Sequence, residues 1–121
     1  MQINTLTVTD ILQQANTNSG EYGNWPLTQV NDHVVRASVM TQPFYWHLHP
    51  NSDESFLVIE CALFIDLEDT TVELTAGQFF TIPKNTKHRT RPKGERSVNI
   101  TFEREDMKTV RIEGRVANSK R

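Results

Sequence analysis

The chain has 121 residues, enough for one domain with its own hydrophobic core. Its hydrophobic fraction of 36%, charged fraction of 23% and net charge of −2 are ordinary for a globular protein and give no reason to expect nucleic acid as a partner. Because it has a single cysteine (Cys61), no long apolar run and no signal-peptide pattern, we expect a cytoplasmic protein without a membrane span.

The N-terminal residues 1–24 are polar and are predicted to be a lead-in rather than a domain. Asp10 is a good N-cap residue, so a short helix is expected over residues 11–15. The following residues 16–23 carry the turn signal Asn18-Ser19-Gly20 and are predicted to be a loop.

From residue 25 onwards, short β-like runs alternate with turn clusters. Many short strands at regular spacing are typical of an all-β sandwich or barrel, which we place at residues 25–104. Beyond it, residues 105–121 are predicted to be a basic C-terminal strand or tail. The expected strands are residues 27–30, 33–41, 45–49, 54–60, 62–67, 71–74, 79–82, 88–91 and 97–103.

Two of these runs have informative patterns. In 97–103, apolar residues alternate with Asn99, Thr101 and Glu103, so we expect one face of this strand to be solvated. Residues 56–59 are apolar on both faces, so their outer face must be covered. We interpret it as a self-association surface that makes a homodimer. Coverage by the N-terminal segment is the open alternative.

The main group of metal-binding residue types is the run His47-Leu48-His49, followed by Glu54 and, much later, by His88. His47 and His49 are two residues apart, so on a strand both side chains point to the same face. If that face is turned inwards, the imidazoles need polar partners and the Glu54 carboxylate needs a cation. Neutral imidazole nitrogens are common metal ligands. The pattern therefore indicates a metal site that His88 completes from another strand.

Three imidazoles and one carboxylate suit a divalent transition metal: Fe, Mn, Ni, Co, Cu or Zn. The ligand types alone do not select among these metals. The absence of thiolates argues against a structural zinc site. Asp53 is an alternative oxygen ligand, but we favour Glu54 because it begins an apolar strand. His33 lies next to a turn and is expected at the surface.

These motifs resemble those of the cupin superfamily. The first cupin motif contains His-x-His and a glutamate, and residues 47–54 match its centre. The second motif runs from a glycine through a proline to a histidine, and Gly77, Pro83 and His88 fit its spacing. The match covers roughly residues 25–104.

The resemblance implies a small antiparallel jelly-roll β-barrel, also called a double-stranded β-helix, which is often paired as a dimer. It also implies the identity of the metal ligands, which are His47, His49, Glu54 and His88.

Departures from the motifs concern turns rather than ligands. The closing glycine of the first motif falls at Cys61, where a positive φ would cost about 1 kcal/mol if the glycine turn is kept. Asn85 replaces a glycine of the second motif, and this is a mild change because asparagine tolerates a left-handed conformation. Thr41 replaces the leading glycine of the first motif, and Pro92 the final asparagine of the second.

Cupins include oxygenases, isomerases, epimerases and non-catalytic binders, so the fold does not fix the function. Our first hypothesis is a metal-dependent enzyme, oxygenase-like, acting on a small molecule. The open alternatives are a non-catalytic module that binds a small ligand or a metal, a sugar isomerase or epimerase, and an inert barrel with a structural metal.

Residues near the motifs suggest the character of the cavity. Tyr45 shares the imidazole face and is the candidate catalytic proton donor, while Phe56 and Val58 would make the wall apolar. An anionic ligand is an option, because several basic residues surround His88 in the sequence and one of them could steer it to the site. These are Lys84, Lys87, Arg89, Arg91, Lys93 and Arg96.

Overall fold

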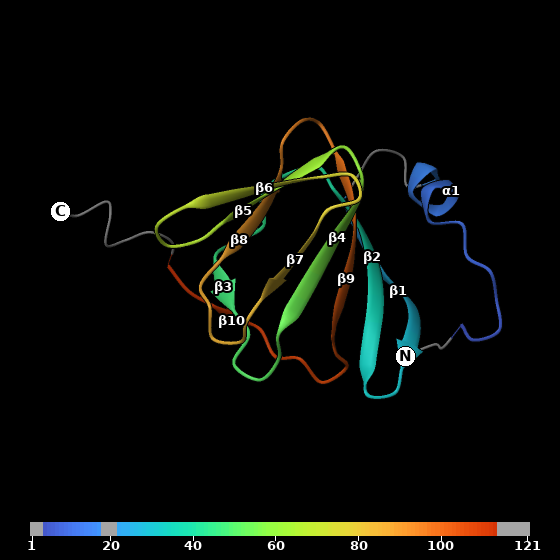
Figure 1. The fold of residues 1–121 in the computed structure, drawn as a ribbon, viewed down its shortest axis with the longest axis horizontal. Coiled ribbons are helices and arrows are strands. Elements are labelled where there is room, and N and C mark those ends of the chain that lie inside the picture. Colours follow the sequence, from blue (N-terminus) through green and yellow to red (C-terminus); the bar gives the residue numbers. More distant parts are fainter. Residues whose placement is uncertain (1–3, 18–21, 114–121) are drawn as a thin grey trace.

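The structure, a computed structural model, describes residues 4–17 and 22–113, which form antiparallel strands preceded by one short helix (Figure 1). The elements are α1 (Ile11–Asn16), β1 (Gly23–Val30), β2 (His33–Met40), β3 (His47–Leu48), β4 (Glu54–Glu60), β5 (Ala62–Asp66), β6 (Thr71–Thr75), β7 (Phe79–Ile82), β8 (Arg89–Pro92), β9 (Ser97–Arg104) and β10 (Val110–Arg111).

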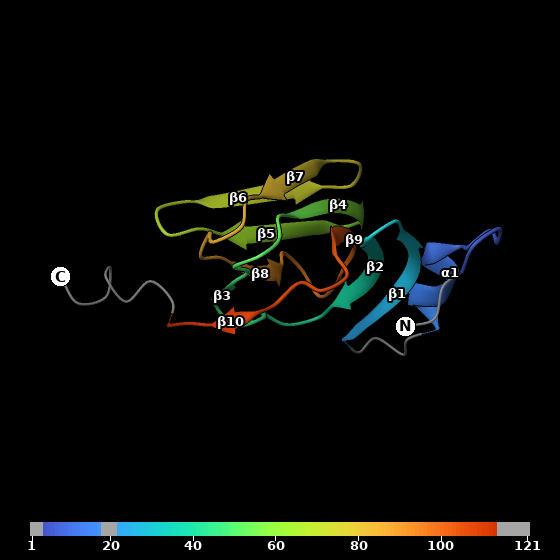
Figure 2. The same ribbon diagram turned by 90° about the horizontal axis from the view of Figure 1, so that it is seen from below.

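The strands form three antiparallel sheets. The largest has the order β1-β2-β9-β4-β7, the second has the order β6-β5-β8, and the third pairs β10 with β3. A bridge between His47 and His88 joins the β3 region to the chain just before β8. In Figure 2, β6 and β7 lie along one side of the molecule and β3 and β10 along the other. The jelly-roll fold predicted from the sequence is confirmed.

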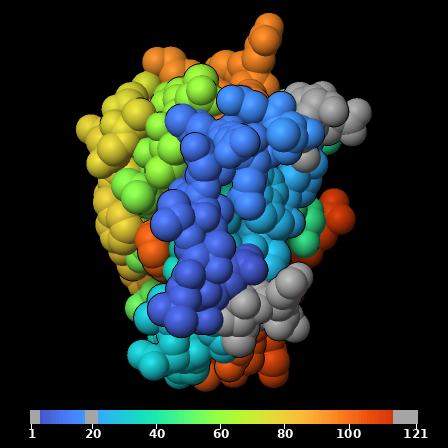
Figure 3. Space-filling view, turned by 90° about the vertical axis from the view of Figure 1, so that its right-hand side faces the viewer, coloured from blue at the N-terminus to red at the C-terminus, as the bar shows by residue number. Residues whose placement is uncertain are grey.

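The predicted helix is confirmed and packs on the outside of the large sheet. The Asp10 side chain accepts a hydrogen bond from the backbone N–H of Gln13 (3.0 Å) and caps α1. Ala15 is fully buried against the outer face of the sheet, and Ile11 packs beside it. In Figure 3 the N-terminal segment (dark blue) runs across this face and leaves parts of the green, yellow and orange strands visible beside it.

Three strands differ from their predicted bounds in ways that affect the candidate site. β1 begins at Gly23 rather than at residue 27, and β8 begins at Arg89 rather than at His88. β3 has only two residues, because its partner β10 pairs with it only through Val110 and Arg111. The region before His47 is therefore not a strand.

The run at 56–59 is divided between the two faces of β4. Phe56 and Val58 are buried in the interior core with residues such as Leu63 and Ile65. Ile59, on the outer face, packs against the N-terminal helix. The N-terminal segment therefore covers one end of this face, as the alternative interpretation expected.

The prediction of a solvated face on residues 97–103 is wrong. Asn99, Thr101 and Glu103 are all buried, with at most 7% of each residue exposed. The apolar residues Ile100 and Phe102 lie on the outer face, where the hydrophobic cluster also includes Ile11 of α1. The interior of this barrel contains a polar cavity, so the polar face of β9 is turned inwards.

Within the part of the chain that the structure describes, no helix has the length and apolar character needed to cross a membrane.

Candidate metal centre

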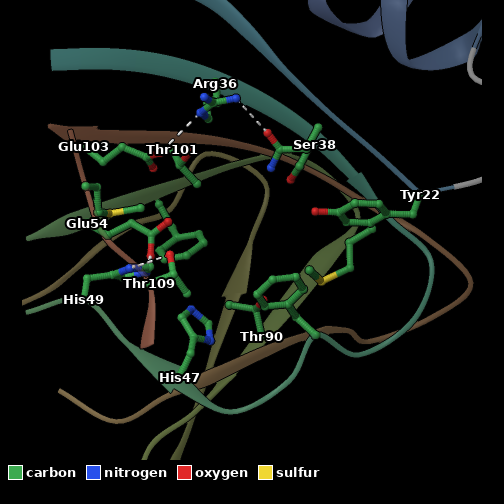
Figure 4. Close-up of a pocket in the computed structure, with 15 residues that line it drawn as sticks. Tyr22, Arg36, Ser38, His47, His49, Glu54, Thr90, Thr101, Glu103 and Thr109 are labelled. Atoms are coloured by element: carbon green, nitrogen blue, oxygen red, sulfur yellow. Dashed lines mark hydrogen bonds and ion pairs between the residues drawn. The ribbon is translucent and has the colours of Figure 1, made fainter. Parts of the chain in front are cut away.

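Four predicted ligands meet in the interior of the barrel. His47 begins β3, His49 follows it, Glu54 begins β4, and His88 precedes β8. One ligand atom from each residue lies within 4.8 Å of the others. The backbones of His47 and His88 exchange two hydrogen bonds of 3.0 Å, which brings these distant parts of the chain together. Figure 4 shows His47, His49 and Glu54 on one side of the cavity.

Backbone carbonyls fix the orientation of all three imidazole rings. The Nδ1 atom of His47 lies 2.8 Å from the carbonyl oxygen of Tyr45, and that of His88 lies 2.8 Å from the carbonyl oxygen of Thr86. The Nδ1 atom of His49 lies 2.9 Å from the carbonyl oxygen of Lys108. A carbonyl only accepts, so each Nδ1 carries the proton, and a neutral ring then has its lone pair on Nε2. Metal-binding histidines are commonly held in this way.

The Nε2 atoms of His49 and His88 converge on the carboxylate of Glu54. His49 Nε2 lies 3.1 Å from Glu54 Oε1, and His88 Nε2 lies 3.5 Å from the same oxygen. His88 is 1% exposed, and its Nε2 has no hydrogen-bond partner among the described residues. Buried polar atoms are almost always satisfied, so this nitrogen indicates that the set is completed by a bound group. The donor set fits a divalent cation.

The protonation states of His47 and Glu54 at neutral pH also suit a cation. Burial and the neighbouring His88 lower the pKa of His47 to about 4, so that its ring is neutral. Burial raises the pKa of Glu54, but the hydrogen bond with His49 and the neighbouring His49 and His88 rings outweigh it and lower the pKa to about 2. Burial lowers the pKa of His49, but Glu54 outweighs this and raises it. A metal would compete with that proton on His49.

A cavity of about 170 Å³ lies beside these residues and opens to the solvent. Its size fits a small molecule rather than a polymer segment. One part of its wall is apolar and is formed by Met40, Phe44 and Phe56. The polar lining residues are Tyr22, Asn24, Arg36, Ser38, His47, His49, Glu54, Thr90, Thr101, Glu103 and Thr109.

Arg36 and Glu103 form an ion pair in the wall of the cavity. Arg36 Nε lies 3.3 Å from Glu103 Oε2, and Arg36 Nη1 donates to Asn24 Oδ1 at 3.3 Å. Glu103 is also the direct partner of Glu54 in the register of β9 and β4. Burial and the nearby Glu54 charge raise the pKa of Glu103 to about 7. The two carboxyl groups therefore differ in their affinity for a proton.

Tyr45 does not line the cavity, where the neighbouring Phe44 lies instead. The Tyr45 ring stacks on Phe44 at 4.2 Å, lies under the Arg111 guanidinium at 4.7 Å, and is 37% exposed. Its carbonyl oxygen, rather than its hydroxyl, contacts His47. The catalytic role of Tyr45 stays a prediction.

The two residues considered beside the ligand set lie elsewhere. His33 is exposed and bonded to Asp32, as expected of a surface residue. Asp53 is exposed and accepts a hydrogen bond from the backbone N–H of Lys84. Of the two acidic candidates, Glu54 is the one that the structure places with the histidines.

None of the basic residues around His88 lines the cavity. Arg89 and Arg91 both bind Asp66 on the second sheet. Three others form ion pairs with acidic residues: Lys87 with Glu68, Lys93 with Glu73, and Arg96 with Glu60. Lys84 lines a separate exposed cleft. Among the described lining residues, Arg36 is the one arginine, and none is a lysine. Arg36 was not among the residues predicted for the site, although it shares a strand face with Ser38 and Met40, which also line the cavity.

The comparisons with known proteins agree with this geometry. The family model of the cupin domain matches residues 37–102. The uncharacterized protein YdbB of Bacillus subtilis (strain 168) is 43% identical over 105 residues, which cover 86% of this chain and 92% of YdbB. The chain belongs to the cupin family.

Solved structures support the same fold. A cupin-2 domain protein from Shewanella frigidimarina has a TM-score of 0.75 at 24% identity, over 81% of this chain and 95% of that one. A protein with a double-stranded β-helix domain from Klebsiella pneumoniae has a TM-score of 0.73 at 17% identity, over 88% of this chain and 96% of that one.

Proposed function

We propose that this cupin binds one divalent transition metal through His47, His49, His88 and Glu54 and is a metal-dependent enzyme acting on a small molecule. The observation that carries the proposal is the set of three carbonyl-held imidazoles gathered with one buried carboxylate, so that one ligand atom of each residue lies within 4.8 Å of the others. Such preorganisation is costly in a core unless a cation uses it.

The first reaction class that we propose is oxygenase-like. A ferrous ion in this site would supply substrate chelation and oxygen activation, whereas another divalent ion would supply polarisation of a carbonyl. The protein itself holds the ligand atoms in place, and Phe44, Phe56 and Met40 make an apolar wall that limits water around a bound substrate.

The second candidate reaction class is proton transfer, as in an isomerase or epimerase. The position of Glu103 supports it. This residue lines the cavity, lies beside Glu54 in the register of β9 and β4, and is absent from the ligand set. A carboxyl group there is placed to hold or accept a proton at one of its oxygens. A non-catalytic binding module would use the same cavity without turnover.

The proposal is tested by elemental analysis of untagged protein purified without chelator, both in air and anaerobically. We expect near-stoichiometric metal in the wild type and background levels in His49→Ala and His88→Ala. The matched control is His33→Ala, which removes an exposed imidazole outside the site and should keep the metal.

The outcomes separate the candidates. Iron that is lost in air would favour oxygenase chemistry, whereas tightly held zinc or nickel would favour the isomerase or the binding module. A wild type without metal, or full retention of metal in His49→Ala, would contradict the ligand assignment.

We also propose a homodimer formed through the outer face of the large sheet. The Phe79 and Phe102 rings lie 5.9 Å apart there, and Phe79 is 56% exposed. The N-terminal helix covers Ile59 but leaves Phe79 open to solvent, and exposed aromatic clusters commonly mark interaction surfaces.

A further inference from the structure

We infer that the ligand of this site is a small monocarboxylate whose carboxylate binds Arg36 while a second oxygen donor faces the imidazole nitrogens. The inference rests on the proposed function, because the second donor is placed toward the metal. It adds the chemical class of the ligand and a recognition residue.

Arg36 has N–H donors at the cavity that no described residue accepts from. The guanidinium has five N–H donors, of which Nε faces Glu103 and one on Nη1 binds Asn24. The remaining donors have no partner among the described residues, although the side chain lines the cavity and is only 33% exposed. A planar fork of N–H groups matches the geometry of a carboxylate.

Arg36 lies on the opposite side of the cavity from the imidazoles of His47 and His49 (Figure 4). It comes from β2, whereas the proposed metal ligands lie in or just after β3, at the start of β4 and just before β8. In Figure 4 the guanidinium lies across the cavity from His47. Glu103 and Asn24 hold it there, so that little side-chain freedom is lost when a ligand binds. A ligand that spans the cavity therefore meets Arg36 at one end and the imidazoles at the other.

The charge of the cavity also favours an anionic ligand. The charged residues of the lining are Arg36, Glu54 and Glu103, and the imidazoles are neutral when they bind a metal. With a divalent cation present, the net charge of the cavity is positive whether Glu103 is ionised or protonated. A monoanion is therefore attracted, whereas a neutral analogue of the same shape is not. The apolar residues Phe44 and Phe56 suit the hydrocarbon part of such a ligand.

The test uses cobalt-loaded protein, in which the visible absorption of Co(II) reports on ligands that reach the metal. The probes are lactate, 3-hydroxybutyrate and 4-hydroxybutyrate, each compared with its own neutral amide. The series varies the distance between the carboxylate and the hydroxyl group, so the best spacing is found rather than assumed. Cobalt content is measured first for every variant.

We expect at least one acid to bind the wild type about tenfold or more tightly than its amide. In Arg36→Gln that preference should fall several-fold with cobalt content unchanged, because only the charge of the metal then favours the anion, and Arg36→Lys should keep part of the preference. The matched control is Arg104→Gln, because Arg104 lies on β9 next to Glu103 but outside the cavity and pairs with Asp106.

The inference is overturned if every acid and amide bind equally, or if Arg36→Gln keeps the preference, while cobalt still binds. Failure of the wild type to bind cobalt would instead overturn the metal proposal and this inference with it. The cobalt measurement therefore distinguishes the two failures.

Discussion

The side chain of Asn51 holds the backbone of Lys108 in place beside the candidate metal centre. Its Oδ1 accepts a hydrogen bond from the Lys108 N–H at 2.9 Å, and its Nδ2 donates to the Asp106 carbonyl at 3.0 Å. The carbonyl of Lys108 in turn receives Nδ1 of His49 at 2.9 Å. Asn51 therefore orients His49, a proposed metal ligand, through the backbone of a segment that is distant in the sequence, and it is a positioning residue for the candidate site.

The first prediction follows from this chain of hydrogen bonds. Asn51→Ala should weaken metal binding about 10- to 100-fold, as loss of a supporting contact typically does, because the Lys108 carbonyl is no longer fixed. The measurement is a competition titration with a metal-binding dye, together with circular dichroism to verify the fold. The control is Lys108→Ala, which removes an exposed side chain but keeps both backbone contacts. Equal affinities in the two variants would refute the positioning role.

The grouping of the four candidate ligands was predictable because it depends on residue type and short spacing. His47, His49 and Glu54 lie within eight positions of one another, and His88 lies in a recognisable second motif. The support for His49 was not predictable, since Lys108 is distant in sequence and contributes only its backbone. Backbone partners leave no signal in residue identity.

Tyr45 illustrates the limit of alternation as a guide. The rule that residues two apart share a face holds only within a strand, and β3 begins at His47. Glu103 illustrates another limit. Alternation along β9 identified a polar face, but it did not reveal that this face is turned inwards, because that depends on the segment that covers the opposite face.

The second prediction concerns the turn at Cys61, which has a φ of 67° and is exposed. The glycine expected at this position would adopt that conformation without strain, so Cys61→Gly should raise the free energy of unfolding by about 1 kcal/mol. Thermal and urea unfolding under reducing conditions measure it. Cys61→Ala retains a Cβ atom and should give no such gain. A gain of the same size in both variants would assign the effect to the thiol rather than to the backbone.

The third prediction concerns the outer face of the large sheet. Phe79→Glu places a charge in the exposed aromatic cluster with Phe102 and should convert the proposed homodimer to a monomer. Size-exclusion chromatography with light scattering at tens of micromolar measures the mass. Val30→Glu is the matched control, because Val30 is 54% exposed at the far end of β1. A monomeric wild type would contradict the dimer itself.

The fourth prediction concerns Asp66, which is buried between two arginines of β8. Arg91 and Arg89 bind its carboxylate at 2.8 and 2.9 Å, and Thr71 donates to it at 2.7 Å. Burial raises the pKa of Asp66, but these hydrogen bonds outweigh it and hold the pKa well below its usual range. Asp66→Asn should therefore lower the free energy of unfolding by about 2 kcal/mol at neutral pH, a moderate value because the arginines are partly exposed.

The pH dependence of this difference follows from the direction of the shift. A carboxyl with a depressed native pKa stabilises the fold fully above its unfolded pKa of about 3.9, and this stabilisation is lost as the pH falls toward the native pKa. The difference in the free energy of unfolding between wild type and Asp66→Asn, measured with urea, should therefore be constant from about pH 7 to about pH 5. It should become smaller near about pH 3. Glu73→Gln, which breaks the exposed pair with Lys93, should have almost no effect at any of these values. A gap that widens in acid would contradict the role assigned to Asp66.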